Sequence, residues 1–179
     1  MIITGAAVFI SFCAFFVSIY QTSVLKKQTD IMNEQKEAAV WPRLFTARNT
    51  GPNVLQFTLQ NDGVGPALIK YIEVTMDGSP YASWRNMFYV LNDSCEVRAA
   101  ISMINNRVIK AGESVILCSL MDEDFINSFY KKRPKIGIDI YYESVYGRLW
   151  RLHQVPSKKF AVPKLVDSYP VNSDREFMN

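Results

Sequence analysis

The residues best suited to chemistry lie late in the chain, where Arg148, Trp150, Arg151 and His153 stand close together. Guanidinium groups bind phosphates, and an aromatic ring can stack on a base. This combination predicts a surface for an anionic ligand, and a nucleotide or oligonucleotide signal has the fitting chemistry. A solvated cationic face near anionic lipid headgroups explains the same residues without any ligand. The sequence favours this simpler interpretation and leaves the other open.

Residues for catalysis or metal binding are scarce. His153 is the only histidine, and no serine or cysteine motif accompanies it. The three cysteines, Cys13, Cys95 and Cys118, are too few for a disulfide framework, and Cys118 lies within a strand pattern that predicts a small core residue. We therefore expect no enzymatic activity, no metal and no cofactor.

Two other motifs have structural explanations. The stretch Asn61-Asp-Gly-Val-Gly-Pro-Ala67 lacks the Gly-Lys-Ser/Thr ending of a phosphate loop and joins two expected strands, so it predicts a turn. The carboxylates Asp122, Glu123 and Asp124 precede a helical pattern, where they can cap the helix and complement its dipole. Neither motif indicates a binding site.

The composition narrows the class of protein. The 179 residues are 49% hydrophobic, which excludes wholesale disorder, and their number suits one domain with an appendage. The formal net charge is only +3, from 20 basic and 17 acidic residues. Such a small and scattered excess argues against binding of duplex nucleic acid.

The first segment has the character of a membrane span. Residues 2–20 contain no charged residue, amide side chain or proline, and a helix of 19 residues is about 28 Å long, close to the thickness of a ~30 Å hydrocarbon core. A cleaved signal peptide explains the segment less well, because there is no basic region before it. The sequence therefore predicts that the chain crosses the lipid bilayer once.

The charges around this span predict its orientation. The first basic residues are Lys26 and Lys27, with Lys36 and Arg43 further on, and none precedes the span. We expect the membrane to be a bacterial inner membrane. The positive-inside rule then places the N-terminus outside the cell membrane and the body in the cytoplasm. Free cysteines in the body fit this reducing compartment.

The helical pattern continues beyond the span to Ala39 and ends before Trp41-Pro42. Steps of three and four residues from Thr4 trace a heptad seam whose members within the span are all small, and whose later members alternate glutamine with Leu, Met and Ala. The seam residues are Thr4, Ala7, Ser11, Ala14, Ser18, Gln21, Leu25, Gln28, Met32, Gln35 and Ala39. We expect residues 1–40 to form a transmembrane helix with a helical stalk that self-associates.

Three interpretations of this seam remain. A tight dimer or trimer would use the small residues as contacts. A looser bundle would expose the hydroxyl and amide groups to a central water path, because buried amides must find partners. A plain anchor with a polar stalk would need neither contacts between helices nor a water path. The glutamines modestly favour the looser bundle with a central water path.

The body, residues 41–163, has the pattern of a mainly β domain. Alternating apolar residues predict antiparallel strands arranged as a sandwich or small barrel with short inserted helices. The expected strands are 43–49, 54–60, 66–76, 100–104, 107–109, 114–120, 135–143 and 148–154, the helices are 83–91 and 123–132, and 164–179 is a polar tail. Asn105-Asn106 is expected to join its flanking strands as a hairpin.

The whole architecture resembles small bacterial membrane effectors of antiphage, nucleotide-signalling defence systems. The resemblance rests on the span 2–20, the stalk 21–39 and β-domain landmarks such as Trp41-Pro42, 61–67 and 142–150. It implies a homo-oligomer of three or more chains, forming a gated channel or permeabilising pore under control of the cytoplasmic domain. The domain would respond to a nucleotide signal or a regulatory protein. A membrane-tethered binding or scaffold module without transport is the alternative.

Overall fold

The computed structural model describes residues 2–51, 53–92, 97–155, 161–170 and 176–178, with only the backbone described for residues 2–8 and 92. The chain divides into two compact units, Met1–Ala39 and Val40–Asn179.

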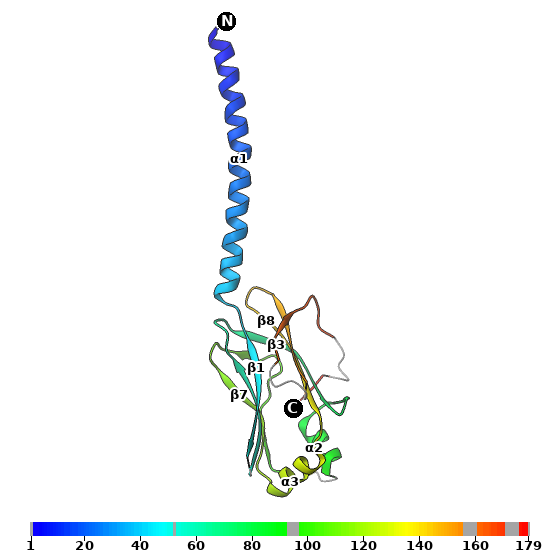
Figure 1. Cartoon of the computed structure of the whole chain (residues 1–179). Helices are drawn as coiled ribbons and strands as arrows, with labels where there is room; N and C mark the ends of the chain where they lie inside the picture. Colours follow the sequence, from blue (N-terminus) through cyan, green and yellow to red (C-terminus); the bar gives the residue numbers. More distant parts are fainter. Residues whose placement is uncertain (1, 52, 93–96, 156–160, 171–175, 179) are drawn as a thin grey trace. The chain divides into compact units, whose positions relative to one another are not determined.

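The first unit is one helix, α1 (Ile2–Ala39), of 38 residues (Figure 1). Good helix formers continue it past the apolar segment, and it ends before Trp41-Pro42, where a proline cannot extend the hydrogen-bond ladder. Large apolar side chains such as Phe9 and Tyr20 are more than two-thirds exposed. By length and composition α1 can cross a membrane.

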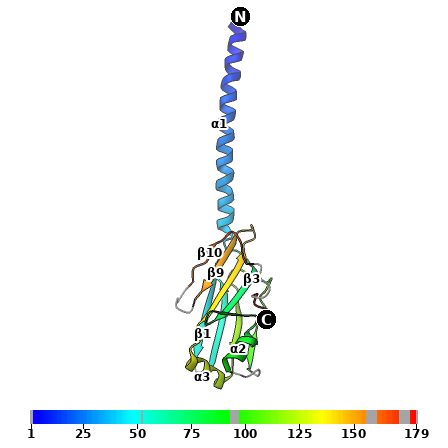
Figure 2. The ribbon, with the colours of Figure 1, turned by 90° about the vertical axis from the view of Figure 1, so that its right-hand side faces the viewer.

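The second unit contains two antiparallel sheets (Figure 2). The first has the order β1-β2-β7-β5, and the second has the order β10-β9-β8-β3-β4 with β6 added to β3. Their strands are β1 (Leu44–Gly51), β2 (Val54–Asn61), β3 (Ala67–Met76), β4 (Ser79–Tyr81), β5 (Ala99–Ile101), β6 (Val108–Ile109), β7 (Ser114–Leu120), β8 (Ile136–Glu143), β9 (Leu149–Gln154) and β10 (Lys164–Leu165). The expected N-terminal apolar helix followed by a mostly antiparallel β domain is confirmed.

The buried core contains apolar side chains from both sheets. Leu55 and Leu59 on β2 alternate with exposed or half-buried residues, and Ile138 and Ile140 lie on β8; all four belong to one buried cluster. The period of two in the sequence therefore identified the inner faces correctly.

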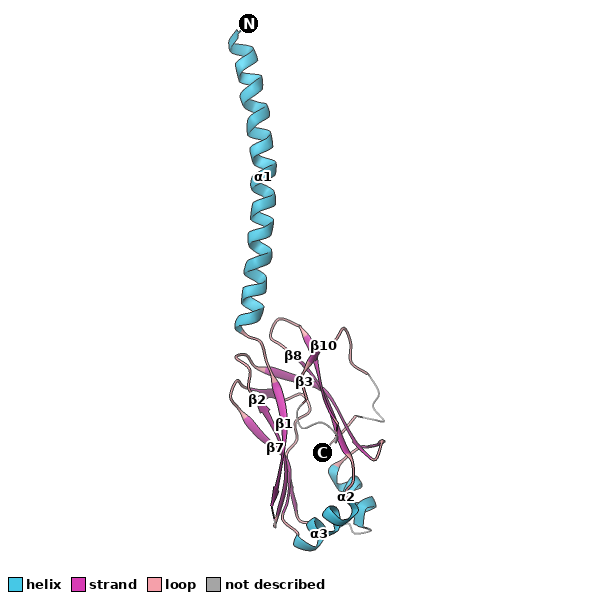
Figure 3. Cartoon of the chain, in the orientation of Figure 1, coloured by secondary structure: helices cyan, strands magenta, loops and turns pink. Residues whose placement is uncertain are grey.

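Two short helices close one end of the β domain (Figure 3). They are α2 (Trp84–Asn92) and α3 (Glu123–Lys132). The Asp122 carboxylate caps α3 by accepting a hydrogen bond from the Phe125 amide at 2.9 Å, as the sequence predicted. The rings of Phe88 and Phe125 pack edge to face, which joins α2 to α3.

The hairpin expected around Asn105-Asn106 is wrong. β5 pairs with β7 in the first sheet, and β6 pairs with β3 in the second, so the two segments belong to different sheets. Both strands are only two or three residues long. Such short segments carry too little alternation to reveal their partners.

The C-terminal segment 164–179, expected as a polar tail, is part of the β domain where it is described. β10 pairs with β9, and the Phe177 amide donates to the carbonyl of Ile72 at 2.9 Å. The Phe177 ring is 2% exposed and packs edge to face against Trp84. A single aromatic residue therefore ties an otherwise polar segment to the core.

Candidate functional site

The seam residues lie along α1 and face solvent wherever their side chains are described. These are Ser11, Ala14, Ser18, Gln21, Leu25, Gln28, Met32, Gln35 and Ala39, while the side chains of Thr4 and Ala7 lie outside the description. The hydroxyl of Ser18 donates to the carbonyl of Ala14 at 2.9 Å. A hydroxyl satisfied by its own helix can lie in lipid or against another helix without losing a hydrogen bond.

The chain enters the β domain immediately after α1. Ala39 is the last helical residue, and the carbonyl of Trp41 already accepts hydrogen bonds from Val64 and Gly65 at 3.0 and 3.4 Å. The next bond runs from the Asp62 amide to the carbonyl of Arg43 at 2.8 Å. We call the contacts of residues 40–44 with the turn 61–65 the exit clamp.

Asn61 is the centre of the exit clamp, and its side chain is completely buried. Its Oδ1 accepts from the amides of Arg43 and Gly63 at 3.1 and 3.0 Å. Its Nδ2 donates to the carbonyls of Gly65 and Ile109 at 2.8 and 3.0 Å. Both lone pairs and both protons of the amide are therefore used.

Two glycines let the backbones of the exit clamp touch. A Cβ at Gly65 would lie 1.9 Å from the carbonyl oxygen of Val40, and one at Gly63 would lie 2.3 Å from the amide nitrogen of Arg43. No larger residue fits either position without moving backbone. The motif 61–67 is a turn, as predicted, but its glycines serve this close approach.

Tyr142 on β8 supports the exit clamp from the second sheet. Its hydroxyl accepts from the Leu44 amide at 3.4 Å and donates to the Pro42 carbonyl at 3.5 Å. Burial raises the pKa of this phenol far above its ordinary value, so it stays neutral. The start of β1 is thus bonded to both sheets.

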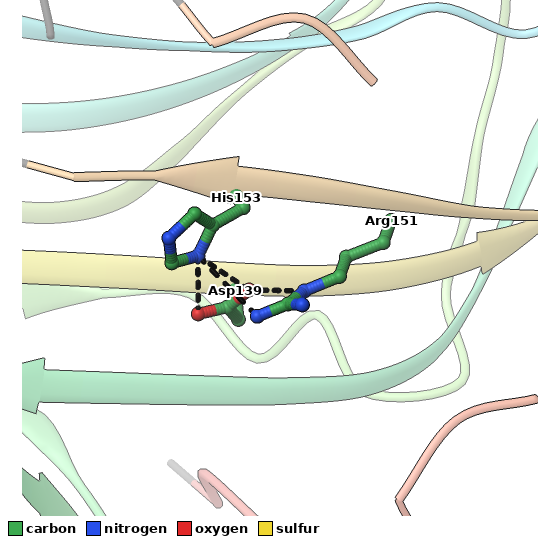
Figure 4. A network of polar contacts seen from close by, with 3 residues as sticks. All are labelled: Asp139, Arg151 and His153. Carbon is green, nitrogen blue, oxygen red and sulfur yellow. Dashed lines mark hydrogen bonds and ion pairs between the residues drawn. The ribbon is translucent and has the colours of Figure 1, made fainter. Parts of the chain in front are cut away.

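A second candidate site is the polar cluster on the outer face of β8 and β9, formed by Asp139, Arg151 and His153 (Figure 4). Arg151 Nε donates to Asp139 Oδ1 at 2.7 Å, and His153 Nδ1 lies 2.8 Å from the same oxygen. The bond to Asp139 raises the pKa of the Arg151 guanidinium, which also lies over the Tyr141 ring at 5.5 Å. His153 Nδ1 can donate to this carboxylate in the tautomer that carries its proton on Nδ1.

The polar cluster borders an open hollow of about 620 Å³. The hollow is lined by Thr75, Asp77, Gly78, Lys135, Gly137, Asp139, His153 and Val155. Thr75 pairs with Gly137 in the β3–β8 register, and a Cβ at Gly137 would lie 2.6 Å from the Thr75 hydroxyl. Any side chain at position 137 would therefore collide with the Thr75 hydroxyl unless the Thr75 side chain moved.

The predicted ligand set is only partly brought together. Arg151 and His153 share the outer face, but Trp150 points to the other face, where its ring lies 5.8 Å from that of Trp41. Arg148 is in the β8–β9 turn at the opposite end of β9 from His153. Trp150 is therefore not placed to stack on a base beside Arg151.

Sequence reasoning missed Asp139, which joins the two cations. The alternation of residues 135–143 places Asp139 on the outer face, and this signal was readable. Its position opposite His153 depends on the register between β8 and β9, which alternation does not determine.

The carboxylate of the polar cluster is already engaged by its neighbours. Asp139 already accepts from two side chains, and no serine or cysteine bonds His153 in the described part of the chain. Burial raises the pKa of Cys118 to about 12, so that thiol is no nucleophile. Across the described ranges no three His, Cys, Asp or Glu residues converge as metal ligands.

Comparisons with protein-family models, curated proteins and solved structures found no match.

Proposed function

We propose that this protein is an oligomeric single-pass membrane effector, in the manner of the antiphage effectors that its architecture resembles. In this proposal α1 crosses the bacterial inner membrane with its N-terminus outside and continues as a stalk. Several copies associate along the seam from Thr4 to Ala39 to form a gated channel or permeabilising pore. The cytoplasmic β domain holds the helix bundle in one of two packings.

The observation that carries this proposal is the short connection in sequence between the end of α1 and the first hydrogen-bonded residue of the β domain. Only Val40 separates the last helical residue from Trp41, whose carbonyl is bonded to the turn 61–65. A domain that merely needs tethering can hang on a flexible linker. A domain that must transmit a rearrangement to the helix needs a short connection fixed at one end, and the exit clamp provides it.

In this proposal the polar cluster and its hollow form the surface that binds the controlling ligand. Lys135, His153 and the partly engaged Arg151 can meet an anionic ligand, while Asp77 and Asp139 can meet donors on the same ligand. A ligand that fits one packing of the bundle better than the other shifts the balance by that difference in affinity.

A flexible insertion tests the proposal directly. Gly-Ser-Gly-Ser placed between Ala39 and Val40 leaves α1 and the β domain intact but introduces slack. We expect normal membrane insertion, with dye leakage from vesicles and growth inhibition on expression reduced at least about tenfold. The matched control inserts four alanine residues after Met178, away from the exit clamp, and should leave leakage unchanged.

The insertion also separates the proposal from its alternative. If the flexible insertion leaves activity intact, control of the helix by the β domain is wrong. If the unaltered full-length chain causes no leakage at any protein-to-lipid ratio, the pore itself is wrong.

A membrane-tethered binding module is the second candidate, and the strand order favours it. β1-β2-β7-β5 corresponds to strands A-B-E-D of an immunoglobulin-type sandwich, and β3, β8 and β9 correspond to C, F and G. We propose that the two sheets form such a sandwich. Domains of this architecture are often recognition modules, and recognition needs no transport.

A further inference from the structure

The glutamines of α1 recur every seven residues inside an apolar stripe. Gln28 has Val24 and Leu25 one turn before it and Ile31 and Met32 one turn after it, and these four side chains are 38% to 61% exposed. Gln21 and Gln35 are bordered in the same way one turn before and one turn after. Their neighbours are aliphatic residues, with Met32 beside Gln35 and Ser18 beside Gln21. Each glutamine is therefore the polar centre of an apolar surface that this chain leaves uncovered.

The charges of the same segment avoid this stripe. Residues 21–39 contain three lysines and three acidic residues, so the segment is neutral overall. An α-helix turns by about 100° per residue. Each of these six charged residues is therefore rotated about 80° or more around the helix axis from Gln28. Two such surfaces can approach each other without like-charge repulsion and without burying an ion.

Copies of this chain inserted the same way into one membrane are parallel and at equal depth. Identical residues then face each other in register. An amide both donates and accepts, so glutamine can pair with its own copy, whereas a carboxylate or an ammonium cannot. Polar layers in a helical seam select register and number of strands at some expense of stability.

We propose that Gln21, Gln28 and Gln35 form three amide layers in a parallel, in-register contact between copies of α1, with the apolar side chains around them as the packed surface. The partner is a second copy of this chain. This inference rests on the proposed function for the membrane insertion of α1 and its association along the seam, and it adds the register of the contact and the pairing of the three amides.

Cysteine cross-linking tests the register on the full-length chain in lipid vesicles. In a Cys13→Ala, Cys95→Ser background, Gln28→Cys and Gln35→Cys should form disulfide-linked dimers with copper phenanthroline. Asn33→Cys is the matched control, because Asn33 is also an exposed amide but lies about 140° around the helix from Gln28. We expect at least about tenfold more dimer at 28 and 35 than at 33.

A charge substitution gives an independent reading. Gln28→Glu places ionised carboxylates against each other, so cross-linking through Gln35→Cys, expressed relative to the chain with Gln28 at the same pH, should fall several-fold at pH 7.5 and return towards one near pH 4.5, where the carboxyls are protonated. The ratio removes the slower oxidation of thiols at low pH, which affects both chains alike. Asn33→Glu should change neither. Equal cross-linking at 28 and 33, or no effect of Gln28→Glu, overturns the amide layers.

Leakage from the same vesicles separates this inference from the proposed function. Cross-linking at 28 and 35 without leakage keeps the amide layers and overturns the pore. Leakage without preferential cross-linking at 28 and 35 keeps the pore and overturns the amide layers. Cross-linking at none of the three positions, with protein that runs as a monomer in detergent, overturns the second copy as partner.

Discussion

Asn61→Asp is the smallest change that opens the exit clamp. The substitution keeps the shape of the side chain and keeps an acceptor for the amides of Arg43 and Gly63. It replaces the donor that now bonds the carbonyls of Gly65 and Ile109 at 2.8 and 3.0 Å with an oxygen. An ionised carboxylate would then face two carbonyl oxygens at contact distance in a fully buried position.

The expected loss follows from these two bonds. Each buried carbonyl left without a donor costs about 1–3 kcal/mol, and the repulsion adds to this, so we expect a loss of about 3–5 kcal/mol at pH 7. Asn49→Asp on β1 is the matched control, because its side chain is exposed and makes only a long contact with Gln56. A loss within about 0.5 kcal/mol is expected there.

The loss should depend on pH. Carbonyl oxygens favour the protonated carboxyl, so in the Asn61→Asp variant the folded-state pKa of the introduced carboxyl is raised above its unfolded value of about 3.9. Proton binding then favours the folded state, and stability is lost as the pH rises from the unfolded pKa through the folded one. Lowering the pH from 7 to 4.5 should therefore recover part of the loss.

Urea denaturation of full-length protein in a nonionic detergent, followed by tryptophan fluorescence at pH 7 and 4.5, measures both quantities. A loss below about 1 kcal/mol at pH 7, or one equal to that of Asn49→Asp, would refute the account of Asn61 as a saturated buried amide. Equal losses at the two pH values would refute the assignment of Nδ2 to the carbonyls.

Three further outcomes are expected. Phe177→Ala should lower the free energy of unfolding by about 3–5 kcal/mol in urea titrations, because it empties a buried site, while Met178→Ala, at an exposed side chain, should stay within about 0.5 kcal/mol. Burial raises the pKa of the Tyr142 hydroxyl in the folded state. The contribution of this group to stability is therefore intact below about pH 10 and is lost as the pH rises further. Between pH 9 and 11, Tyr142→Phe should lose less stability than the unaltered chain in the same urea titration. The Cys118 thiol, whose pKa burial raises to about 12, should resist maleimide at pH 8 until denaturant is added, as measured by peptide mass spectrometry.

Local patterns were enough to predict the elements that have a strong period. α3 begins and ends where the sequence indicated, and β7 matches its expected range because its apolar pattern spans seven residues. The apolar segment of α1 was readable from the absence of charge alone. These features depend on neighbours in sequence, so no knowledge of the fold was needed.

Contacts between distant strands were not predictable in the same way. Asn61 meets Arg43 across 18 residues and Ile109 across 48, and Asp139 meets His153 only because β8 and β9 have one register and not the next. A slip of one residue would send each side chain to the other face without changing the sequence pattern. The site residues that were missed are therefore those whose roles depend on pairing.

The turn 61–67 connects these observations. The sequence predicted a turn here, and in the structure Gly63 and Gly65 admit the backbone of residues 40–43 at a distance no other residue allows. Every hydrogen-bonding group of the Asn61 side chain is used, and two positions accept only glycine. A chain that needs only to be tethered does not require such an arrangement. The same residues are well suited to hold the chain that leaves α1 in one position on the β domain, which is what the proposed control of α1 requires.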